Sequence, residues 1–327
     1  MAHPRESLPL GAIIGSFRIS RVIGKGGFSL IYLAEDRESG NEVIVKEYMP
    51  KKLTRRTNSL ELAIIEDKNA ERVIRGRKLF FQEAAALASL RHPNIVRVVG
   101  LFLANNTVYM VMQHERGKNL GGYVHERKGG LSTNFIFRVF LPLLDALSLM
   151  HSRSILHLDI KPGNIHLRHG NDPLLLDFGA VQLLSQERPS GSQIITAGYS
   201  PVEQYYRGGV IGPWTDVYAV GATLRTCIEG KTPPPAVERH KGMTMTPATH
   251  QLRDRYPPFL LEAVDWAMEM DPGRRPQDAG ELLRTLEQHE SELPRSRNLA
   301  AQTRDVASGD MSQFPTQDSE LRLARKI

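Results

Sequence analysis

The sequence predicts an α+β fold in which a β-rich N-terminal part precedes a mainly α-helical C-terminal part. Two short apolar runs flank a glycine-rich segment at residues 23–29, a pattern typical of two strands joined in a hairpin. Further strand-like runs end at Lys46 and at Met112, and segment 79–87 between them has helical periodicity. Helical patterns dominate after about Leu120, at residues 135–151, 214–229, 258–269 and 279–287.

Length and composition are those of a soluble globular chain. With 327 residues, 41% of them hydrophobic and 24% charged, the chain can form one domain of about 270 residues with a well-buried core. No apolar run approaches the roughly eighteen residues that span a bilayer, so we expect no membrane span. The N-terminus lacks the apolar core of a signal peptide, which predicts a cytoplasmic protein. The single cysteine, Cys227, excludes an intrachain disulfide and is expected to fill the core.

The net charge of +6 raises the question of a nucleic-acid partner. The basic residues are dispersed, apart from one cluster made of Lys51, Lys52, Arg55 and Arg56. No recognition motif and no basic stripe with interleaved aromatic residues accompany this cluster. We therefore expect no specific nucleic-acid partner and interpret the cluster as a solvated face. A docking patch for an acidic partner or for phosphoprotein substrates is the alternative interpretation.

A short polar segment carries the strongest chemical signal. Asp159, Lys161 and Asn164 lie within residues 157–164, and Asp177 follows at the start of an Asp-Phe-Gly turn. Transfer of a γ-phosphoryl group from Mg-ATP needs such groups: a carboxylate that orients the hydroxyl, a cation beside the phosphate, and two oxygen donors for the metal. Each feature alone is typical of a polar turn. Their order, downstream of the glycine-rich segment, makes the combined signal specific.

In this order and spacing, the motifs resemble those of the eukaryotic-like (Hanks-type) protein Ser/Thr kinases. The residues within the motifs resemble those of the bacterial branch of this family. The resemblance covers roughly residues 17–288. It implies the two-lobed protein-kinase fold, with a β-rich N-lobe that carries the C-helix and a mainly α-helical C-lobe. The kinase domain is then expected at residues 16–289. We expect a flexible leader at residues 1–15, an N-lobe at 16–112 and a C-lobe at 116–289. Within the N-lobe, residues 48–76 are an insertion of unassigned role, and residues 290–327 form a polar, disordered tail.

The resemblance also implies roles for five charged or polar residues. Asp159 would orient the substrate hydroxyl, and Lys161 would contact the γ-phosphate, as is typical of Ser/Thr kinases. Thr196 would hydrogen-bond both of these side chains. Lys46 would contact the α- and β-phosphates, and Glu83 on the C-helix would be its ion-pair partner.

An ATP site and a metal site follow from the same resemblance. The metal ligands would be Asn164 and Asp177, whose hard oxygen atoms suit Mg²⁺, with Mn²⁺ as an alternative. The residues expected to bind the nucleotide are Ile23, Gly24, Lys25, Gly26, Gly27, Ile31, Ile44, Lys46, Met112, Gln113, His114 and Asn119.

Downstream motifs indicate a platform for a peptide. Ser200-Pro201-Val202-Glu203 resembles the Ala-Pro-Glu that closes the activation segment, and Arg275 is similar to the arginine that pairs with Glu203. Asp216 resembles the aspartate of the central F-helix that braces the catalytic loop. These elements, together with Thr196, argue against a small-molecule phosphotransferase with the same two-lobed fold.

Four positions depart from the family pattern, and one of them is Ser29, which replaces the third glycine of the glycine-rich loop. Leu158 stands where regulated kinases have an Arg that gathers a phosphorylated loop residue, so activation through phosphorylation of Ser185, Ser190 or Ser192 is not expected to use this route. Ile44 replaces a small residue beside adenine and would crowd the purine. Asn119 stands near the usual ribose-contact acid and could still hydrogen-bond a hydroxyl.

The sequence therefore predicts a Ser/Thr protein kinase that phosphorylates hydroxyls of protein substrates and its own chain. A partner or a ligand could supply its input signal, and the tail could dock or regulate. The alternative is a pseudokinase or nucleotide-binding scaffold with weak or no catalysis, for which Leu158, Ile44 and Asn119 would be the supporting features.

Overall fold

The structure is a computed structural model that describes residues 6–176, 182–183, 195–206 and 208–290. All of these residues belong to one compact unit, residues 1–291. Several predicted features lie outside the described residues: Asp177, Ser185, Ser190, Ser192 and the tail beyond Glu290.

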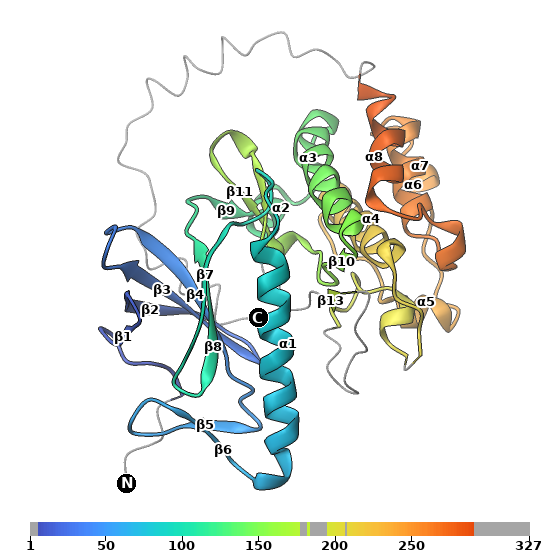
Figure 1. The fold of residues 1–327 in the computed structure, drawn as a ribbon. Coiled ribbons are helices and arrows are strands. Elements are labelled where there is room, and N and C mark those ends of the chain that lie inside the picture. The colour runs from blue at the N-terminus through green and yellow to red at the C-terminus, as the bar shows by residue number, and fades with distance from the viewer. Residues whose placement is uncertain (1–5, 177–181, 184–194, 207, 291–327) are drawn as a thin grey trace, which may run out of the picture. The chain divides into compact units, whose positions relative to one another are not determined.

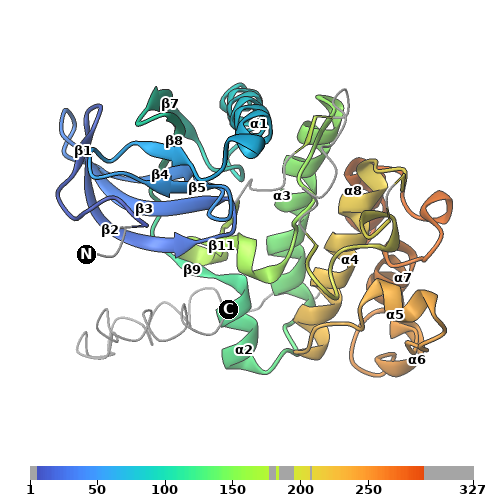
Figure 2. The ribbon, with the colours of Figure 1, turned by 90° about the horizontal axis from the view of Figure 1, so that it is seen from below.

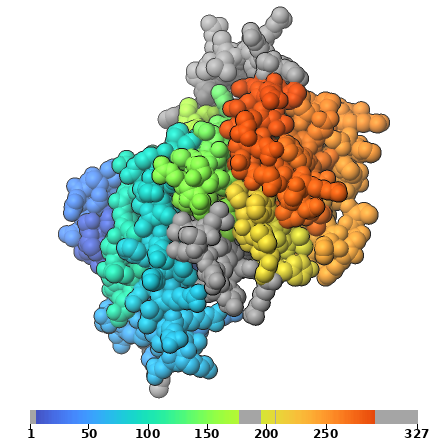
Figure 3. Space-filling view, turned by 45° about the vertical axis from the view of Figure 1, so that its right-hand side comes forward, coloured from blue at the N-terminus to red at the C-terminus, as the bar shows by residue number. Residues whose placement is uncertain are grey.

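A six-stranded sheet forms the N-lobe (Figure 1). Its strand order is β1-β2-β3-β4-β8-β7, and every neighbouring pair is antiparallel. The strands are β1 (Ile13–Ile14), β2 (Phe17–Lys25), β3 (Ser29–Asp36), β4 (Glu42–Tyr48), β7 (Val98–Ala104) and β8 (Thr107–Gln113). Helix α1 (Ala70–Ala88) contacts β7 and β8, and atoms of its outer side are exposed on the face shown in Figure 3.

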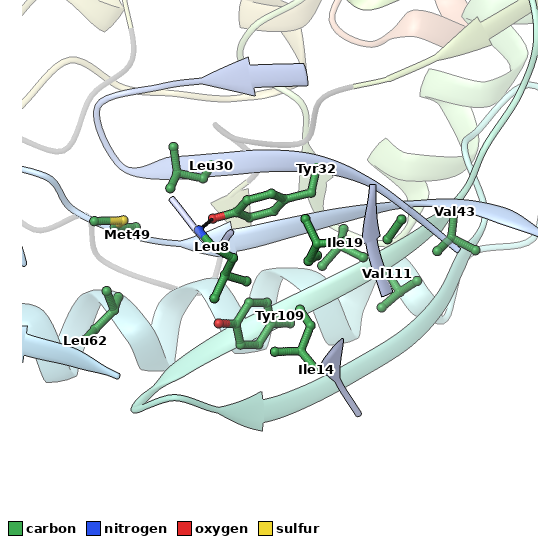
Figure 4. Packing of buried hydrophobic residues seen from close by; sticks show 12 residues of the cluster. Leu8, Ile14, Ile19, Leu30, Tyr32, Val43, Met49, Leu62, Tyr109 and Val111 are labelled. Atoms are coloured by element: carbon green, nitrogen blue, oxygen red, sulfur yellow. Dashed lines mark hydrogen bonds between the residues drawn. The ribbon is translucent and has the colours of Figure 1, made fainter. Parts of the chain in front are cut away.

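The N-lobe core lies on one face of this sheet. Because successive side chains of a strand alternate between faces, Val43, Val45 and Glu47 of β4 point to one side and Ile44 and Lys46 to the other. Val43 and Val45 join a cluster of buried residues from β2, β3, β8, the leader and the insertion (Figure 4). Members drawn there include Leu8, Ile14, Tyr32, Met49, Leu62, Tyr109 and Val111.

Residues 6–15 differ from the loosely held leader that the sequence suggests. Leu8 and Ile14 are only 3% and 4% exposed, and the amide of Leu8 donates a 3.2 Å hydrogen bond to the hydroxyl of Tyr32. Leu8 and Ile14 pack in the buried cluster of the N-lobe, whereas Leu10 and Ile13 are 79% and 52% exposed. Two residues of the leader therefore belong to the core of the N-lobe.

The insertion contains a hairpin followed by the first turns of α1. Strand β5 (Thr54–Arg56) pairs with β6 (Leu62–Ile64), and the short helix η1 (Asp67–Asn69) leads into α1. The insertion, to which the sequence assigned no role, thus carries two strands of its own. Arg56 is buried, so the interpretation of the basic cluster as a solvated face is wrong for that residue. Helix α1 also begins nine residues before the predicted helical segment 79–87.

The C-lobe is built around two apolar helices. Helix α3 (Thr133–Ser152) packs against α8 (Ala279–Glu287), and α4 (Pro213–Glu229) packs against α7 (Pro258–Ala267) and α8. Proline at the first position of α4 and Gly230 in the left-handed conformation after its last residue account for its ends. Figure 2 shows these helices as one lobe, with the sheet and α1 as the other.

Shorter elements complete the C-lobe. The helices are α2 (Leu120–Arg127), α5 (Ala236–His240), α6 (Ala248–Gln251), η2 (Pro162–Asn164), η3 (His169–Asn171), η4 (Val202–Gln204) and η5 (Pro272–Arg274). The strands are β9 (Lys118–Asn119), β10 (Ile155–Leu156), β11 (Ile165–Leu167), β12 (Pro173–Leu175) and β13 (Gln182–Leu183). They form a three-stranded sheet, β12-β11-β9, and the pair β10-β13.

Helix α3 is the one described helix that is long and apolar enough to cross a membrane by length and composition alone. It has 20 residues and a mean hydropathy of 1.4 over its best window, which the search for apolar runs in the sequence missed. Half of that window is buried inside the lobe. Cys227 of α4 is also fully buried, as predicted, and burial raises the pKa of its thiol.

Candidate active site

Three of the predicted catalytic residues meet at the carboxylate of Asp159. Thr196 Oγ1 donates a hydrogen bond to Asp159 Oδ1 at 2.6 Å. Lys161 Nζ lies 2.9 Å from Asp159 Oδ2 and 3.3 Å from Thr196 Oγ1. Asp159 is only 8% exposed, so these partners act in a partly desolvated setting, where charges interact more strongly than in water.

Asn164 joins the same group from the helix η2. Its Nδ2 donates to the carbonyl oxygen of Asp159 at 2.8 Å and to Oδ2 of Asp159 at 2.9 Å. Because Nδ2 is used in this way, the side-chain oxygen of Asn164 faces away from Asp159. The amide of Leu176 donates to the carbonyl oxygen of Asn164 at 2.9 Å. The predicted second metal ligand, Asp177, follows Leu176 directly but lies outside the described residues.

A buried aspartate on α4 holds the catalytic loop from behind. Asp216 accepts hydrogen bonds from the amides of His157 at 2.8 Å and of Leu158 at 2.7 Å, and lies 3.1 Å from Nε2 of His151. Burial alone would raise the pKa of Asp216, but its hydrogen bond with His151 and these other partners lower it. Leu158 has a φ of 64°, a left-handed conformation that costs a residue with a side chain about 1–3 kcal/mol. The paired amides hold the loop in that conformation.

The Leu158 side chain lies in an apolar setting. It is 2% exposed and forms a small cluster with Leu156, against which Ile211 packs. The carbonyl oxygen of Leu158 accepts a 3.1 Å hydrogen bond from Gln204 Nε2. Sequence reasoning missed Gln204, and no local pattern could have marked it, because its partner is a backbone group 46 positions away.

The segment that follows Thr196 is anchored to the C-lobe. The amide of Thr196 donates to Ser200 Oγ at 3.0 Å, and Glu203 forms a buried ion pair with Arg275 at 2.7 Å. Thr215 donates to the same carboxylate at 3.1 Å, and the Arg275 guanidinium lies 4.9 Å from the centre of the Tyr218 ring. Sequence reasoning found the Glu203 and Arg275 pair but missed Thr215 and Tyr218.

On the N-lobe side, most of the predicted nucleotide residues lie on the four adjacent strands β2, β3, β4 and β8 or at the tip of the β2–β3 hairpin. Strands β2 and β3 form the expected hairpin, whose tip is closed by the amide of Gly26 donating to the carbonyl oxygen of Ser29 at 2.9 Å. In the register of the sheet, Ile31 pairs with Lys46, and Ile44 pairs with Met112. Lys46 is 2% exposed. Glu83 lies half-buried on α1, and its ion pair with Lys46 stays a prediction.

Two of the predicted nucleotide residues, His114 and Asn119, have polar partners within the protein. His114 Nδ1 lies 3.2 Å from a carboxylate oxygen of Glu42. Asn119 is the N-cap of α2, and its Oδ1 accepts a 2.6 Å hydrogen bond from the amide of Gly122. The side-chain oxygen of Asn119 therefore caps the helix, and the hydrogen bond of Asn119 to a nucleotide hydroxyl stays a prediction.

The site thus contains a buried carboxylate that contacts a lysine, a hydroxyl and an amide, and the N-lobe carries a glycine-rich hairpin. Together these features are those of a phosphotransferase of the two-lobed kinase type. Residues 17–286 match the family model of the protein kinase domain. The chain belongs to the protein kinase family.

Bacterial kinases are among its relatives. The chain is 31% identical to the serine/threonine-protein kinase PknA of Nostoc sp. over 83% of its own length and 47% of that protein. It is 31% identical to the serine/threonine-protein kinase PrkC of Bacillus subtilis over 68% of its length and 31% of that protein. The solved structure of the apo form of PpkA-294 is 32% identical, with a TM-score of 0.74, and the match covers 86% of this chain and all of that one. The chain spans about half the length of the first curated relatives it matches.

Proposed function

We propose that this chain is an ATP-dependent protein Ser/Thr kinase that transfers the γ-phosphate of ATP to Ser or Thr hydroxyls of protein substrates, its own chain included. The observation that carries this proposal is the arrangement around Asp159, whose carboxylate contacts Thr196, Lys161 and Asn164 at 2.6–2.9 Å. A carboxylate with a cation and a hydroxyl beside it is suited to orienting an incoming hydroxyl next to a phosphate.

The described residues divide the work as follows. Asp159 accepts a hydrogen bond from the substrate hydroxyl and holds it in line with the γ-phosphorus, which lowers the barrier mainly by positioning. Lys161 places its charge beside this point, where negative charge on the phosphoryl group must be offset. Thr196 contacts both side chains and keeps their positions fixed relative to each other. Lys46 would contact the α- and β-phosphates from the N-lobe.

Asn164 and Asp177 would hold Mg²⁺, with Mn²⁺ as an alternative. The orientation of Asn164 fits this role, because its Nδ2 is bonded to Asp159 and its oxygen faces away from it. Such an amide oxygen is a hard donor of the kind that Mg²⁺ binds. When bound, the metal ion would offset phosphate charge. The nucleotide itself would lie under the glycine-rich hairpin of β2 and β3.

Protein substrates fit better than small molecules. Thr196, Ser200 and Glu203 form a hydrogen-bonded segment tied to Arg275, which offers an ordered edge beside Asp159 for an extended peptide. A regulatory partner and cytoplasmic residence remain predictions from the sequence alone.

The test is transfer of labelled γ-phosphate from Mg-ATP by the purified chain, to itself and to a generic basic protein. We expect label on Ser or Thr with the parent chain and none with Asp159→Asn, at a nearly unchanged melting temperature. Transfer by Asp159→Asn would remove Asp159 from its role. Absence of transfer by the parent chain, with Mg-ATP still bound, would instead support the scaffold alternative.

A further inference from the structure

Glu47, the residue that follows Lys46 on β4, is a fully buried carboxylate. Three side chains donate hydrogen bonds to it: Tyr32 Oη at 2.7 Å, Tyr109 Oη at 2.7 Å and Arg56 Nη2 at 2.6 Å. Tyr32 lies on β3 and Tyr109 on β8, the two strands that flank β4. One carboxylate therefore ties the strand of Lys46 to both of its neighbours in the sheet.

Arg56 connects the insertion to this carboxylate. Its side chain, on β5 of the insertion hairpin, has no exposed surface. It also donates from Nη1 to the carbonyl oxygen of Leu60 at 2.8 Å and from Nε to the carbonyl oxygen of Glu6 at 3.2 Å. Burial would lower the pKa of Arg56, but the charge of Glu47, the hydrogen bond to it and the nearby Tyr32 and Tyr109 together outweigh burial and raise the pKa. One guanidinium thus joins β4, the hairpin and the leader.

The last three residues of β4, Lys46, Glu47 and Tyr48, each face a different part of the N-lobe. Glu47 faces the buried cluster, whereas Lys46 points to the opposite face of the sheet. The ring of Tyr48 lies 5.8 Å from that of Phe80 on α1, and its hydroxyl lies so close to Gly76 that a Cβ there would not fit. A shift of β4 would therefore move Lys46 and, at the same time, disturb the packing of Tyr48 against α1.

Stability alone does not account for this arrangement. Desolvation of two buried charges offsets most of their attraction, and well-packed apolar residues often stabilise a fold equally well. The ion pair instead fixes the position of Glu47 relative to Arg56, because charge-assisted hydrogen bonds tolerate little change in distance or angle. Each oxygen of Glu47 also accepts a hydrogen bond from a tyrosine of a neighbouring strand.

We propose that Glu47 and Arg56 are positioning residues for Lys46: through this pair, the insertion holds β4 where Lys46 meets the phosphates of ATP. The inference rests on the proposed function only through the contact of Lys46 with the nucleotide. It gives the insertion a role in catalysis that its sequence does not suggest.

The test is a double-mutant cycle measured by calorimetry as affinity of the full chain for Mg-ATP. Glu47→Gln/Arg56→Met removes both charges together and keeps an acceptor oxygen for one of the two tyrosines, while the amide NH2 can donate to the hydroxyl oxygen of the other. We expect this pair variant and Lys46→Met each to weaken binding about tenfold, and the triple variant to bind no more weakly than Lys46→Met alone. Additive losses, or unchanged affinity in either the pair variant or Lys46→Met, would overturn the proposal.

Two further variants test whether the loss of Mg-ATP affinity is specific to Arg56 and to the geometry of its guanidinium. Arg55→Met is the matched control, because Arg55 is the exposed neighbour on the same strand, and its affinity for Mg-ATP should equal that of the parent chain. Arg56→Lys keeps the charge near Glu47 but lacks the forked geometry, so it should lose only part of the affinity. If the pair variant does not unfold cooperatively, Arg56→Lys takes its place in the cycle.

Kinetics separate this proposal from the proposed function. In the pair variant we expect kcat to fall about 10- to 100-fold and KM for ATP to rise, while KM for a peptide substrate stays within about twofold. A peptide KM that rises in step with KM for ATP would indicate general loss of structure and contradict the positioning role. If the parent chain transfers no phosphate, the kinase activity fails, but the affinity cycle still decides the role of the pair.

Discussion

The hydroxyl of Thr196 donates a 2.6 Å hydrogen bond to the carboxylate of Asp159, although 37 positions separate the two residues in the chain. Lys161 lies within 3.3 Å of both. The segment that would receive a substrate is thus connected directly to the group that would orient the substrate hydroxyl. Order in one of these parts supports order in the other.

The first prediction concerns this hydroxyl. Thr196→Val keeps the shape of the side chain and removes the bond to Asp159. We expect kcat for peptide phosphorylation to fall about 10- to 100-fold with little change in Mg-ATP affinity, because the loss affects orientation at the transfer step. Thr196→Ser keeps the hydroxyl and serves as the control, with kcat within about threefold of the parent chain. Equal rates for the two variants would contradict the assigned role.

The second prediction is a pH dependence of stability through Asp216. Its folded pKa lies below the ordinary value of 3.8, so the carboxylate stabilises the fold above that value and loses this contribution as the pH falls through the folded pKa. Asp216→Asn should lower the free energy of unfolding by about 3–5 kcal/mol at pH 7, since it leaves two buried amides and His151 poorly paired.

Urea denaturation of the parent chain and of Asp216→Asn checks this prediction across the acidic range. The difference between the two should stay constant from about pH 7 to pH 4 and shrink below that. A difference that grows as the pH falls would show that Asp216 is not the group concerned.

The third prediction concerns Ile44, which faces the side of β4 opposite the buried cluster. If its extra methyl groups crowd adenine, Ile44→Ala should tighten Mg-ATP binding, since overpacking costs about 1–3 kcal/mol. Calorimetry with Mg-ATP measures the effect, and Val43→Ala, which alters the opposite face of the same strand, is the control. An unchanged or weaker affinity in Ile44→Ala would reject crowding.

The fourth prediction follows from the apolar environment of Leu158. Because Leu158 packs with Leu156 and Ile211 and carries no charge, it offers no partner for a phosphate. Simultaneous replacement of Ser185, Ser190 and Ser192 by Ala should therefore leave kcat within about twofold of the parent value. Phosphatase treatment of the parent chain should have equally little effect. A collapse of the rate in either experiment would show that loop phosphorylation acts through other residues.

The catalytic loop illustrates what a sequence allows one to predict. Asp159, Lys161 and Asn164 lie within one short segment, so their mutual distances depend mostly on local backbone geometry. The same holds for the hairpin of β2 and β3, whose glycine tip and apolar flanks predict it directly. Pairings over long distances, such as Glu203 with Arg275, were predictable only through resemblance to a family.

Arg56 illustrates the opposite case. In the sequence it is one of four neighbouring basic residues, and nothing local separates it from exposed Arg55. It is buried because the hairpin folds over the sheet and places β5 beside Glu47, which no local pattern specifies. Asn119 is similar, since whether its oxygen caps α2 or faces a ligand depends on where the helix begins.

The sequence by itself determined which chemical groups are present, their order, and the division into a β-rich part and a helical part. These properties depend on composition, periodicity and short-range spacing, all of which are local. Only the tertiary structure decided that Glu47 and Arg56 are buried together, that Asn119 caps α2, and that Leu8 and Ile14 of the leader join the N-lobe core. Burial and pairing of a side chain depend on which distant surface covers it, and that is a property of the whole packed core.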